Sequence, residues 1–264
     1  MLNLRNIYWS LFKFRFFYRK VHKEFSQRTQ KGVMMNTNDK NRERFNSIAK
    51  TYDKLNHRLS FRFDVYWRKR ALKKHISSSS NKVVDIACGT GDFAIQAAKF
   101  GAKEIIGIDL SENMLEIANA KIKRKNLERI ISVQTGSCAN IEFDDNTFDI
   151  ATIAFGVRNF EDLEVCLKEV LRVLKDEGKI IILEFTIPRN RFFRGIYTFY
   201  INNILPIIGK RISGDKDAYT YLPNSIGKFL QYDDFVALLN TIGFNDVSYK
   251  PLTMGIACVY CGRK

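Results

Sequence analysis

Two acids and two glycines follow one another in the segment VVDIACGTGD, at a spacing that suits nucleoside binding. An apolar strand start runs into Asp85, and Gly89 and Gly91 flank a threonine before a second acid. Small residues after a strand let backbone amides approach a ligand closely and let the next helix pack tightly. About 20 residues further on, a second apolar stretch ends in Asp109, where such sheets place the acid that binds ribose hydroxyls.

The glycine turn alone does not distinguish a dinucleotide from S-adenosylmethionine (SAM). Gly89, Gly91 and Ala94 satisfy the dinucleotide pattern G-x-G-x-x-G/A. A pyrophosphate would lie at the N-terminus of the following helix, where anions are favoured, but Asp92 occupies that position and Asp85 lies just below the turn. Two carboxylates would repel two phosphates, whereas they would tolerate or attract a cationic sulfonium. The turn therefore favours SAM over NAD, although Asp92 could also simply cap the helix.

Composition limits the classes of protein to which the chain can belong. Its 264 residues, 45% hydrophobic and 27% charged, are typical of a globular protein that buries a core. The net charge of +15 suggests an anionic membrane surface, a polyanion, or no more than solvated lysines. No nucleic-acid-reading module is present, so we expect no nucleic-acid partner. No run approaches the ~18 apolar residues of a membrane span.

The cysteines point to a reducing compartment. They are five in number and scattered, which is typical of reduced thiols in the cytoplasm. Cys258 and Cys261 form a C-x-x-C without a second Cys or His pair, and residues three apart in an extended segment face opposite sides of a sheet. We therefore expect no metal.

Residues 1–35 differ from the rest of the chain, because they are basic and aromatic and contain a single acid, Glu24. Three interpretations are open: a helix lying on an anionic membrane, a disordered basic tail, or upstream sequence before a start at Met34 or Met35. A small-residue cleavage site is missing, so a secretory signal is not expected. We favour a dispensable extension and expect residues 36–264 to form one domain.

From Lys82 onward, predicted strands alternate with predicted helices. The predicted strands are Lys82–Ile86, Glu104–Ile108, Ile130–Thr135, Phe148–Ala154 and Lys179–Phe185, and the helices lie at about Asp92–Phe100, Ser111–Lys125 and Asp162–Leu174. The alternation predicts a doubly wound, Rossmann-like α/β sheet, parallel except for a closing antiparallel strand pair over residues 246–264. Ligands bind at the carboxyl ends of such strands.

Two flanking segments are candidates for covering that edge. Residues 41–76 predict two helices that break near Ser60, either as a packing hairpin or as a lid that turns Tyr52 and Asp53 toward the ligand. A serine linker, residues 77–80, leads into the sheet. Residues 188–223 are apolar and aromatic with basic ends, and they either cover an apolar substrate or fill the flank of the sheet.

Several segments together resemble the ubiquinone/menaquinone biosynthesis C-methyltransferases. They are DIACGTGD, GIDLSENML, DNTFDIATIAFGVRNFEDL, RFNSIAKTYDKLNHRLSF, YTYLPNSI and PLTMGIACVY. The similarity covers roughly residues 41–264. FGVRN with YLPNSI is specific, whereas the glycine turn alone would indicate only a class I SAM-dependent methyltransferase, whose first motif glycine is replaced here by Ala87.

The resemblance implies SAM-dependent methylation of a ring carbon in a polyprenylated quinol. We favour demethylmenaquinol, which becomes menaquinol; the alternatives are the methoxy-benzoquinol of ubiquinone biosynthesis and another acceptor. The residues that the resemblance and the glycine turn assign to SAM are Asp85, Gly89, Thr90, Gly91, Asp109, Ser137, Cys138 and Ala154. Ser137 and Ala154 depart from the residues that the family commonly has there.

Catalytic groups are few, because the only histidines are His22, His57 and His75. Arg158 and Asn159 follow the fourth strand and could stabilise a quinolate oxygen or orient a water. Tyr52 and Asp53 could contribute from the lid. A prenylated substrate also implies a cytoplasmic enzyme that is peripheral at the inner face of the cytoplasmic membrane, and a homodimer is compatible with the sequence.

Overall fold

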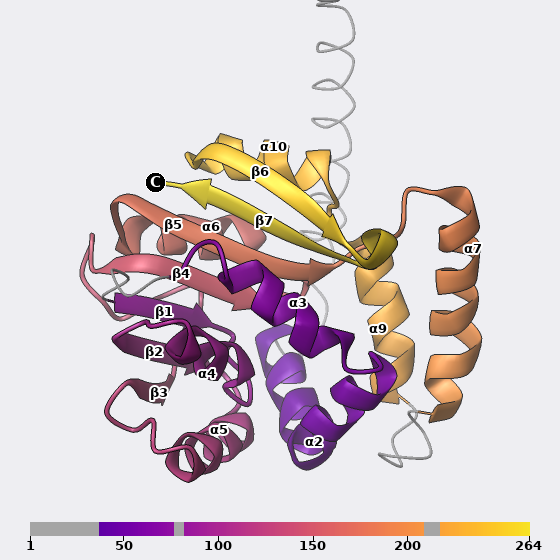
Figure 1. Ribbon diagram of the computed structural model, residues 1–264, viewed down its shortest axis with the longest axis horizontal. Coiled ribbons are helices and arrows are strands. Elements are labelled where there is room, and N and C mark those ends of the chain that lie inside the picture. Colours follow the sequence, from indigo (N-terminus) through magenta and orange to yellow (C-terminus); the bar gives the residue numbers. More distant parts are fainter. Residues whose placement is uncertain (1–36, 77–81, 209–216) are drawn as a thin grey trace, which may run out of the picture. The chain divides into compact units, whose positions relative to one another are not determined.

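The computed structural model describes residues 37–76, 82–208 and 217–264, and residues Asn41–Lys264 form one compact unit (Figure 1). The predicted N-terminal extension (residues 1–35) and the serine linker lie outside the described residues. Among the helices that the structure describes, none is long and apolar enough to cross a membrane.

The unit is built on one seven-stranded sheet in the order β3-β2-β1-β4-β5-β7-β6. The strands are β1 (Lys82–Ile86), β2 (Glu104–Asp109), β3 (Ile131–Thr135), β4 (Phe148–Ala154), β5 (Leu174–Phe185), β6 (Asn245–Leu252) and β7 (Ala257–Arg263). Strands β1 to β5 pair in parallel, while β7 is antiparallel to both β5 and β6. The predicted doubly wound sheet with a closing antiparallel pair is therefore confirmed.

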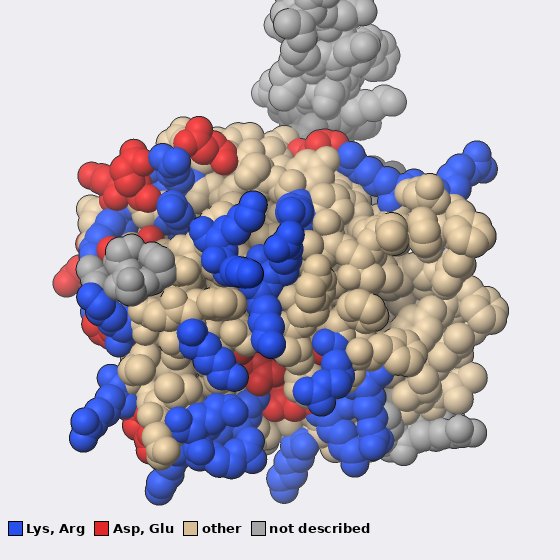
Figure 2. Space-filling model, in the orientation of Figure 1, with Lys and Arg blue, Asp and Glu red and all other residues tan. Residues whose placement is uncertain are grey.

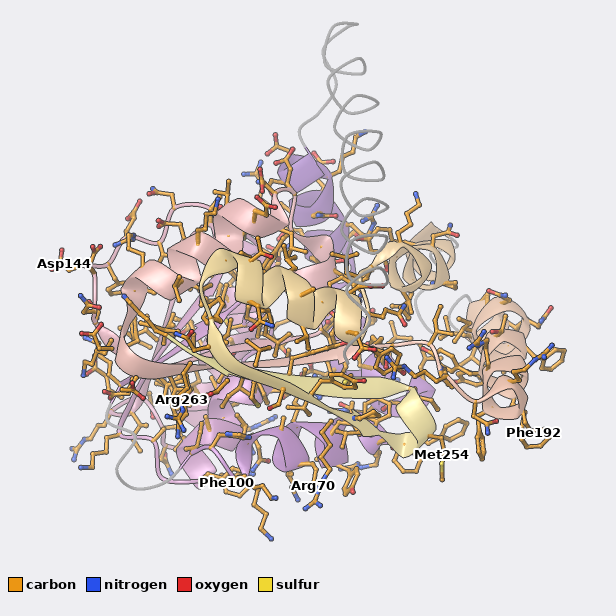
Figure 3. The ribbon with its side chains drawn as sticks, turned by 90° about the horizontal axis from the view of Figure 1, so that it is seen from above. Arg70, Phe100, Asp144, Phe192, Met254 and Arg263 are labelled. Carbon is orange, nitrogen blue, oxygen red and sulfur yellow. A yellow bond between two sulfur atoms is a disulfide. The ribbon has the colours of Figure 1, made fainter. Side chains whose placement is uncertain are left out.

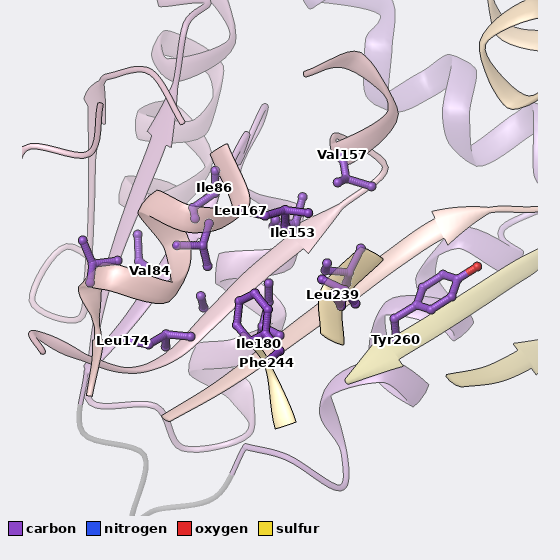
Figure 4. Close-up of a cluster of buried hydrophobic side chains, with 14 of the residues drawn as sticks. Val84, Ile86, Ile153, Val157, Leu167, Leu174, Ile180, Leu239, Phe244 and Tyr260 are labelled. Atoms are coloured by element: carbon purple, nitrogen blue, oxygen red, sulfur yellow. The ribbon is translucent and has the colours of Figure 1, made fainter. Parts of the chain in front are cut away.

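The central strands are apolar in almost every position because both faces of the sheet are covered. One face packs against α6 (Leu163–Val173) and α10 (Asp233–Ile242), in the cluster that Figure 4 shows. The other face packs against α3 (Phe63–Leu72), α4 (Asp92–Lys99) and α5 (Glu112–Arg124). Cys258 and Cys261 belong to opposite faces, as the spacing predicts.

Local capping signals explain where the helices begin. The Ser111 hydroxyl accepts a hydrogen bond from the Met114 amide at 3.2 Å, and the Asp162 carboxylate accepts one from the Val165 amide at 3.0 Å. Regular pairing of β5 with β4 begins at Lys179 as predicted, but the strand itself begins at Leu174 and contains an irregularity.

One prediction about the cysteines was wrong. Cys138, in the loop after β3, and Cys166 of α6 form a disulfide bond, so these two are not free thiols. Cys88, Cys258 and Cys261 are free.

The remaining elements gather at the carboxyl ends of the parallel strands (Figure 1). They are α2 (Thr37–Leu59), the 3-10 turns η1 (Val157–Asn159) and η3 (Thr253–Gly255), α7 (Arg191–Phe199), the π-helical turn η2 (Tyr200–Ile204) and α9 (Asp217–Lys228). The break between α2 and α3 falls at Ser60, as predicted. Both candidate covering segments therefore lie at the predicted ligand-binding edge.

Candidate functional site

The turn after β1 leaves open space at one glycine and requires close packing at the other. Gly89 and Gly91 have φ angles of +55° and +77°, which the backbone of residues other than glycine rarely adopts. A Cβ atom on Gly89 would meet nothing within 4 Å, whereas one on Gly91 would lie 3.2 Å from the Cβ of Ala118 in α5. Gly89 thus faces a space that a ligand can occupy, and Gly91 lets α5 approach the turn.

Asp109 closes this turn from the neighbouring strand. Its carboxylate accepts hydrogen bonds from the amides of Gly89 and Ser111, each at 2.8 Å. Burial raises the pKa of Asp109, and the two amides act against that rise. The acid predicted to bind the ribose therefore lies directly beside the glycine turn.

Asp85 supports the turn from below. It is fully buried, and its two carboxylate oxygens accept hydrogen bonds from the Ala94 amide at 3.1 Å and the Thr152 hydroxyl at 2.7 Å. Burial raises the pKa of Asp85 to about 7. Both oxygens thus have protein partners, and the bond to the Ala94 amide fixes the first turn of α4.

Lys121 is a part of the site that the sequence did not indicate. Its ammonium group donates to Asp53 at 2.7 Å and to the Thr90 hydroxyl at 3.2 Å, and it forms an ion pair with Asp92. The Thr90 hydroxyl donates to Asp53 at 2.5 Å. The negative charge of Asp92 is therefore compensated, so the charge argument that favoured SAM over NAD was incomplete.

A second polar group joins α2 and α3 to the start of α4. His57 Nδ1 lies 2.7 Å from Asp64 and Nε2 lies 3.8 Å from Asp92, while Arg68 donates to Asp64 at 2.5 Å. The ligating atoms of His57, Asp64 and Asp92 lie within 4.8 Å of one another. Asp64 is paired with Arg68, and Asp92 is paired with Lys121, which also holds Asp53, so each acid of this cluster already has a cationic partner.

The predicted contacts after β3 and β4 lie at the same edge of the sheet. The Ser137 hydroxyl accepts a hydrogen bond from the Ala139 amide at 3.2 Å. Cys138 is half-buried and tied to Cys166, and the half-buried Ala154 ends β4. A Cβ atom on Gly136 would approach Ile108 to 2.7 Å, so this loop passes close to β2.

An apolar cavity of about 450 Å³ lies between the two covering segments. Its walls come from α2 and α3, from the ends of β4 and β5, and from α7, η2 and α9. The rings of Phe155 and Phe185 pack at a tilt with centroids 4.4 Å apart, and the Trp67 ring centroid lies 6.2 Å from that of Phe155. The Trp67 indole donates to the Thr253 hydroxyl at 2.7 Å. The cavity is thus dominated by aromatic and aliphatic surface.

Arg158 places a fixed positive charge in the cavity wall. One guanidinium nitrogen donates to the carboxylate of Glu184 at 2.7 Å and to the carbonyl of Phe155 at 2.6 Å. Glu184 is fully buried, which raises the pKa of its carboxyl, while Arg158 acts to lower it. A buried ion pair of this kind holds its members in one geometry.

Asn159 lies beside this pair and is held by two covering elements. Its side-chain oxygen accepts a hydrogen bond from the Tyr221 hydroxyl at 2.6 Å, and its carbonyl accepts one from the Asn41 side chain at 2.8 Å. Asn159 therefore contacts both covering segments, while Arg158 contacts α9, where its Nε donates to the Ser225 hydroxyl at 3.3 Å.

Tyr52 and Asp53 connect the cavity to the glycine turn. Tyr52 lines the cavity, and burial raises the pKa of its hydroxyl although Arg158 acts to lower it. The next residue, Asp53, accepts the hydrogen bond of Thr90 in the turn. Two adjacent residues of α2 thus touch the two compartments, which must lie side by side.

The comparisons with known sequences give one family. The ubiE/COQ5 methyltransferase family matches residues 33–264. The chain is 39% identical to the demethylmenaquinone methyltransferase of Bacteroides fragilis, over 83% of this chain and 90% of the relative. It is 42% identical to the ubiquinone/menaquinone biosynthesis C-methyltransferase UbiE of Geobacter sulfurreducens, over 84% of this chain and 88% of that protein.

Solved structures give the same fold at lower identity. A SAM-dependent methyltransferase of Thermotoga maritima, described as a possible histamine N-methyltransferase, superposes with a TM-score of 0.59 at 21% identity, over 83% of this chain and 98% of that one. A SAM-dependent methyltransferase of Methanococcus maripaludis gives a TM-score of 0.57 at 23% identity, over 83% of this chain and 94% of that one.

Proposed function

The chain belongs to the ubiE/COQ5 methyltransferase family, and from this premise we propose that it transfers the methyl group of SAM to a ring carbon of demethylmenaquinol, giving menaquinol. The observation that carries the proposal is the apolar cavity of about 450 Å³ that adjoins the glycine turn through Tyr52 and Asp53. The 39% identity to a demethylmenaquinone methyltransferase over most of both chains supports it.

The cavity suits a flat ring with a hydrocarbon tail. Ligand pockets of this volume are mostly apolar with a few placed polar groups. Here Trp67, Phe155 and Phe185 supply aromatic surface, and Arg158 and Tyr52 supply the polar groups. Burying a prenylated ring against such walls is favourable by about 25 cal/mol for each Å² of apolar surface removed from water.

On the donor side, we propose that Asp109 binds the ribose and that the open space at Gly89 receives the ligand. SAM, when bound, supplies an electrophilic methyl group on a sulfonium. Thr90, Ser137, Cys138 and Ala154 lie at the same edge of the sheet and would complete the donor site. Gly91 and Asp85 act indirectly, because Gly91 admits α5 and Asp85 fixes the start of α4.

On the acceptor side, the quinol would lose a hydroxyl proton to water, and its adjacent carbon would bond to the methyl group as the bond from that methyl to sulfur breaks, which leaves S-adenosylhomocysteine. The ring proton on the methylated carbon would then go to water and the quinol oxygen would regain a proton, which gives menaquinol. Arg158 would stabilise the quinolate oxygen, since its charge is already fixed in the wall by Glu184. The raised pKa of Tyr52 keeps its hydroxyl protonated near neutrality, so that it donates a hydrogen bond. Asn159 and Asp53 would position these two groups. Holding the reactants at attack distance contributes several kcal/mol on its own.

We further propose that α2 and α3 act as a lid over both compartments and that the enzyme works at the surface of the cytoplasmic membrane. The lid is supported by hydrogen bonds that the side chains of Asn41, Asn46 and Asp53 make with residues at the edge of the sheet. The membrane surface is supported by the apolar cavity and by the net charge of +15.

The direct test is methyl transfer with labelled SAM. The purified protein should move label onto the ring of demethylmenaquinol, and Arg158→Met should lower the rate while SAM binding stays close to that of the parent. A folded protein that binds SAM and leaves demethylmenaquinol unlabelled would contradict the proposal.

The second candidate acceptor is the demethylated methoxy-benzoquinol of ubiquinone biosynthesis. The relatives whose names include both pathways, such as the 42% identical UbiE protein, favour keeping it. A competition between the two quinols at equal concentration decides between them, because the ratio of the labelled products equals the ratio of kcat/KM values.

A further inference from the structure

The mouth of the cavity is ringed by exposed apolar side chains. Five large residues both line the cavity and reach the surface: Phe61, Phe63, Phe193, Ile196 and Met254. Phe61 and Met254 are 71% and 66% exposed. We call these five residues the rim. They come from the α2–α3 turn with the first residue of α3, from α7 and from η3, so three distant segments place apolar surface around one opening. Contiguous exposed apolar surface marks an interaction site.

Two parts of the rim are held in an unusual backbone conformation. Phe61 and Arg62 have φ angles of 50° and 63°, and Thr253 and Met254 have φ angles of 46° and 56°. Non-glycine residues in the left-handed region are strained and persist where the surroundings fix them. The Arg62 amide donates to the His57 carbonyl at 2.7 Å, and Trp67 holds the Thr253 hydroxyl. The fold thus maintains both tips with Phe61 and Met254 exposed.

Helix α7 adds apolar surface next to the rim. Phe192, Ile196 and Phe199 are spaced i, i+4, i+7 and form one stripe on the helix, and Phe192 and Phe199 are 70% and 61% exposed. The residues Phe193 and Tyr197 of the same helix line the cavity. Figure 3 shows Phe192 and Met254 at the same end of the molecule, pointing outward. We call Phe192 and Phe199, which lie outside the cavity, the outer pair.

Positive charge accompanies this surface. Arg58 and Arg62 are exposed at the α2–α3 turn, and Arg191 and Arg194 are exposed on α7. Among the ion pairs of the described residues, none joins a carboxylate to any of these four arginines. In Figure 2 the surface over α7 is mostly uncharged, and Lys and Arg side chains lie to either side of it.

We propose that the rim and the outer pair dock on an anionic lipid bilayer, so that the cavity mouth opens into the hydrocarbon. The proposal rests on the proposed function, since it explains how a prenylated quinol reaches the cavity without crossing water. Apolar side chains flanked by arginines match an interface in which acyl chains underlie anionic headgroups. A second copy of the chain on this surface would instead close the mouth.

The first experiment places a fluorophore on the outer pair in the full chain. Phe192→Trp adds a third tryptophan to Trp9 and Trp67, and Val165→Trp, at an exposed apolar position of α6, is the matched control. Vesicles of phosphatidylcholine and phosphatidylglycerol with brominated acyl chains should quench and blue-shift the emission added by Phe192→Trp and leave that added by Val165→Trp unchanged. Unquenched Phe192→Trp emission with vesicle-bound protein overturns the proposal. A change that follows protein concentration without lipid assigns the surface to a homodimer and also overturns it.

The second experiment separates docking from chemistry. The variant Phe192→Ser/Phe199→Ser should lose about tenfold in the rate of methylation of a long-chain quinol in vesicles, a factor that corresponds to about 1.4 kcal/mol. With a short-chain quinol in solution it should keep its rate within about twofold, as should Val165→Ser with both substrates. Equal losses on both substrates would show a structural effect and overturn docking. A parent protein inactive on both quinols would refute the proposed function, and the fluorescence would still decide on docking.

Discussion

Two residues with positive φ angles end neighbouring strands of the sheet and shape the site. Ala87 after β1 has φ 53°, and Phe155 after β4 has φ 58°. Ala87 stands where the class I methyltransferase motif has its first glycine, so a strained alanine is retained there. Its neighbour across the strands is Gly156, on which a Cβ atom would lie 2.8 Å from the Ala87 Cβ. The two positions are thus complementary in size.

This complementarity predicts strong coupling between two substitutions. Gly156→Ala should lower the free energy of unfolding by about 1–3 kcal/mol through overpacking, whereas Ala87→Gly removes both the opposing methyl group and the backbone strain. The free energy of unfolding of the double variant should therefore exceed, by about 1 kcal/mol or more, the value obtained by adding the changes of the two single variants. Denaturant unfolding of the four proteins measures the coupling; additive effects would contradict the contact.

Asp109 provides the sharpest test of the donor site. Asp109→Ala should weaken SAM binding by about tenfold or more, since hydrogen bonds to a charged group contribute about 1.5–3 kcal/mol. Glu104→Ala, at the exposed opposite end of β2, is the control and should bind SAM like the parent. Calorimetric titration measures both. Unchanged affinity in a folded Asp109→Ala protein would place the ribose elsewhere.

At the scale of elements, α2 is attached to the donor turn largely by polar side chains. The side-chain oxygen of Asn46 accepts a hydrogen bond from the Ser111 hydroxyl at 2.6 Å. Lys121 of α5 forms ion pairs with both Asp53 of α2 and Asp92 of α4. Burial acts to raise the pKa of Asp92, but Arg68 and Lys121 hold it below its ordinary value. One ammonium group therefore keeps two carboxylates from repelling each other across the lid contact.

Removing that ammonium should loosen the lid. Lys121→Met should speed hydrogen exchange in residues 41–59 and lower the free energy of unfolding by about 2 kcal/mol, because two carboxylates lose their shared partner. Lys123→Met, at an exposed position of the same helix, should change neither quantity. If α2 exchanges at the parent's rate in Lys121→Met, the lid is held by its apolar contacts instead.

At the scale of the whole molecule, a buried carboxyl makes stability depend on pH. The pKa of Asp85 is raised to about 7, so between the unfolded value near 4 and about 7 the folded state binds more protons than the unfolded state. The contribution of the Asp85 carboxyl to the free energy of unfolding is therefore most favourable below pH 4, and it is lost as the pH rises to 7. Between pH 4 and pH 7, the free energy of unfolding of the parent should fall by up to about 4 kcal/mol relative to that of Asp85→Asn. Unfolding titrations at pH 4, 5.5 and 7 measure the difference, and a constant difference would contradict the shift.

The sequence predicted the sheet and helices well because their signals are local. The Ser111 cap, the apolar runs of β1 and β4 and the acid Asp109 each depend on a few neighbouring residues. The contacts of Lys121, the Arg158–Glu184 pair and the Cys138–Cys166 disulfide join residues far apart in the chain. No spacing rule brings those partners together, so they became visible only in three dimensions.

The size of the cavity has a consequence for which substrates the enzyme can tell apart. About 450 Å³ accommodates a bicyclic ring and the first part of a prenyl tail, as for other pockets that enclose drug-sized molecules. The rest of a long tail must remain outside the cavity, beyond the exposed side chains of Phe61 and Met254, where the cavity walls do not contact it. The enzyme should therefore select substrates by the ring and the first isoprene units, and its activity should not depend on the total length of the tail. A cell could then change the length of its quinone tails without changing this methyltransferase.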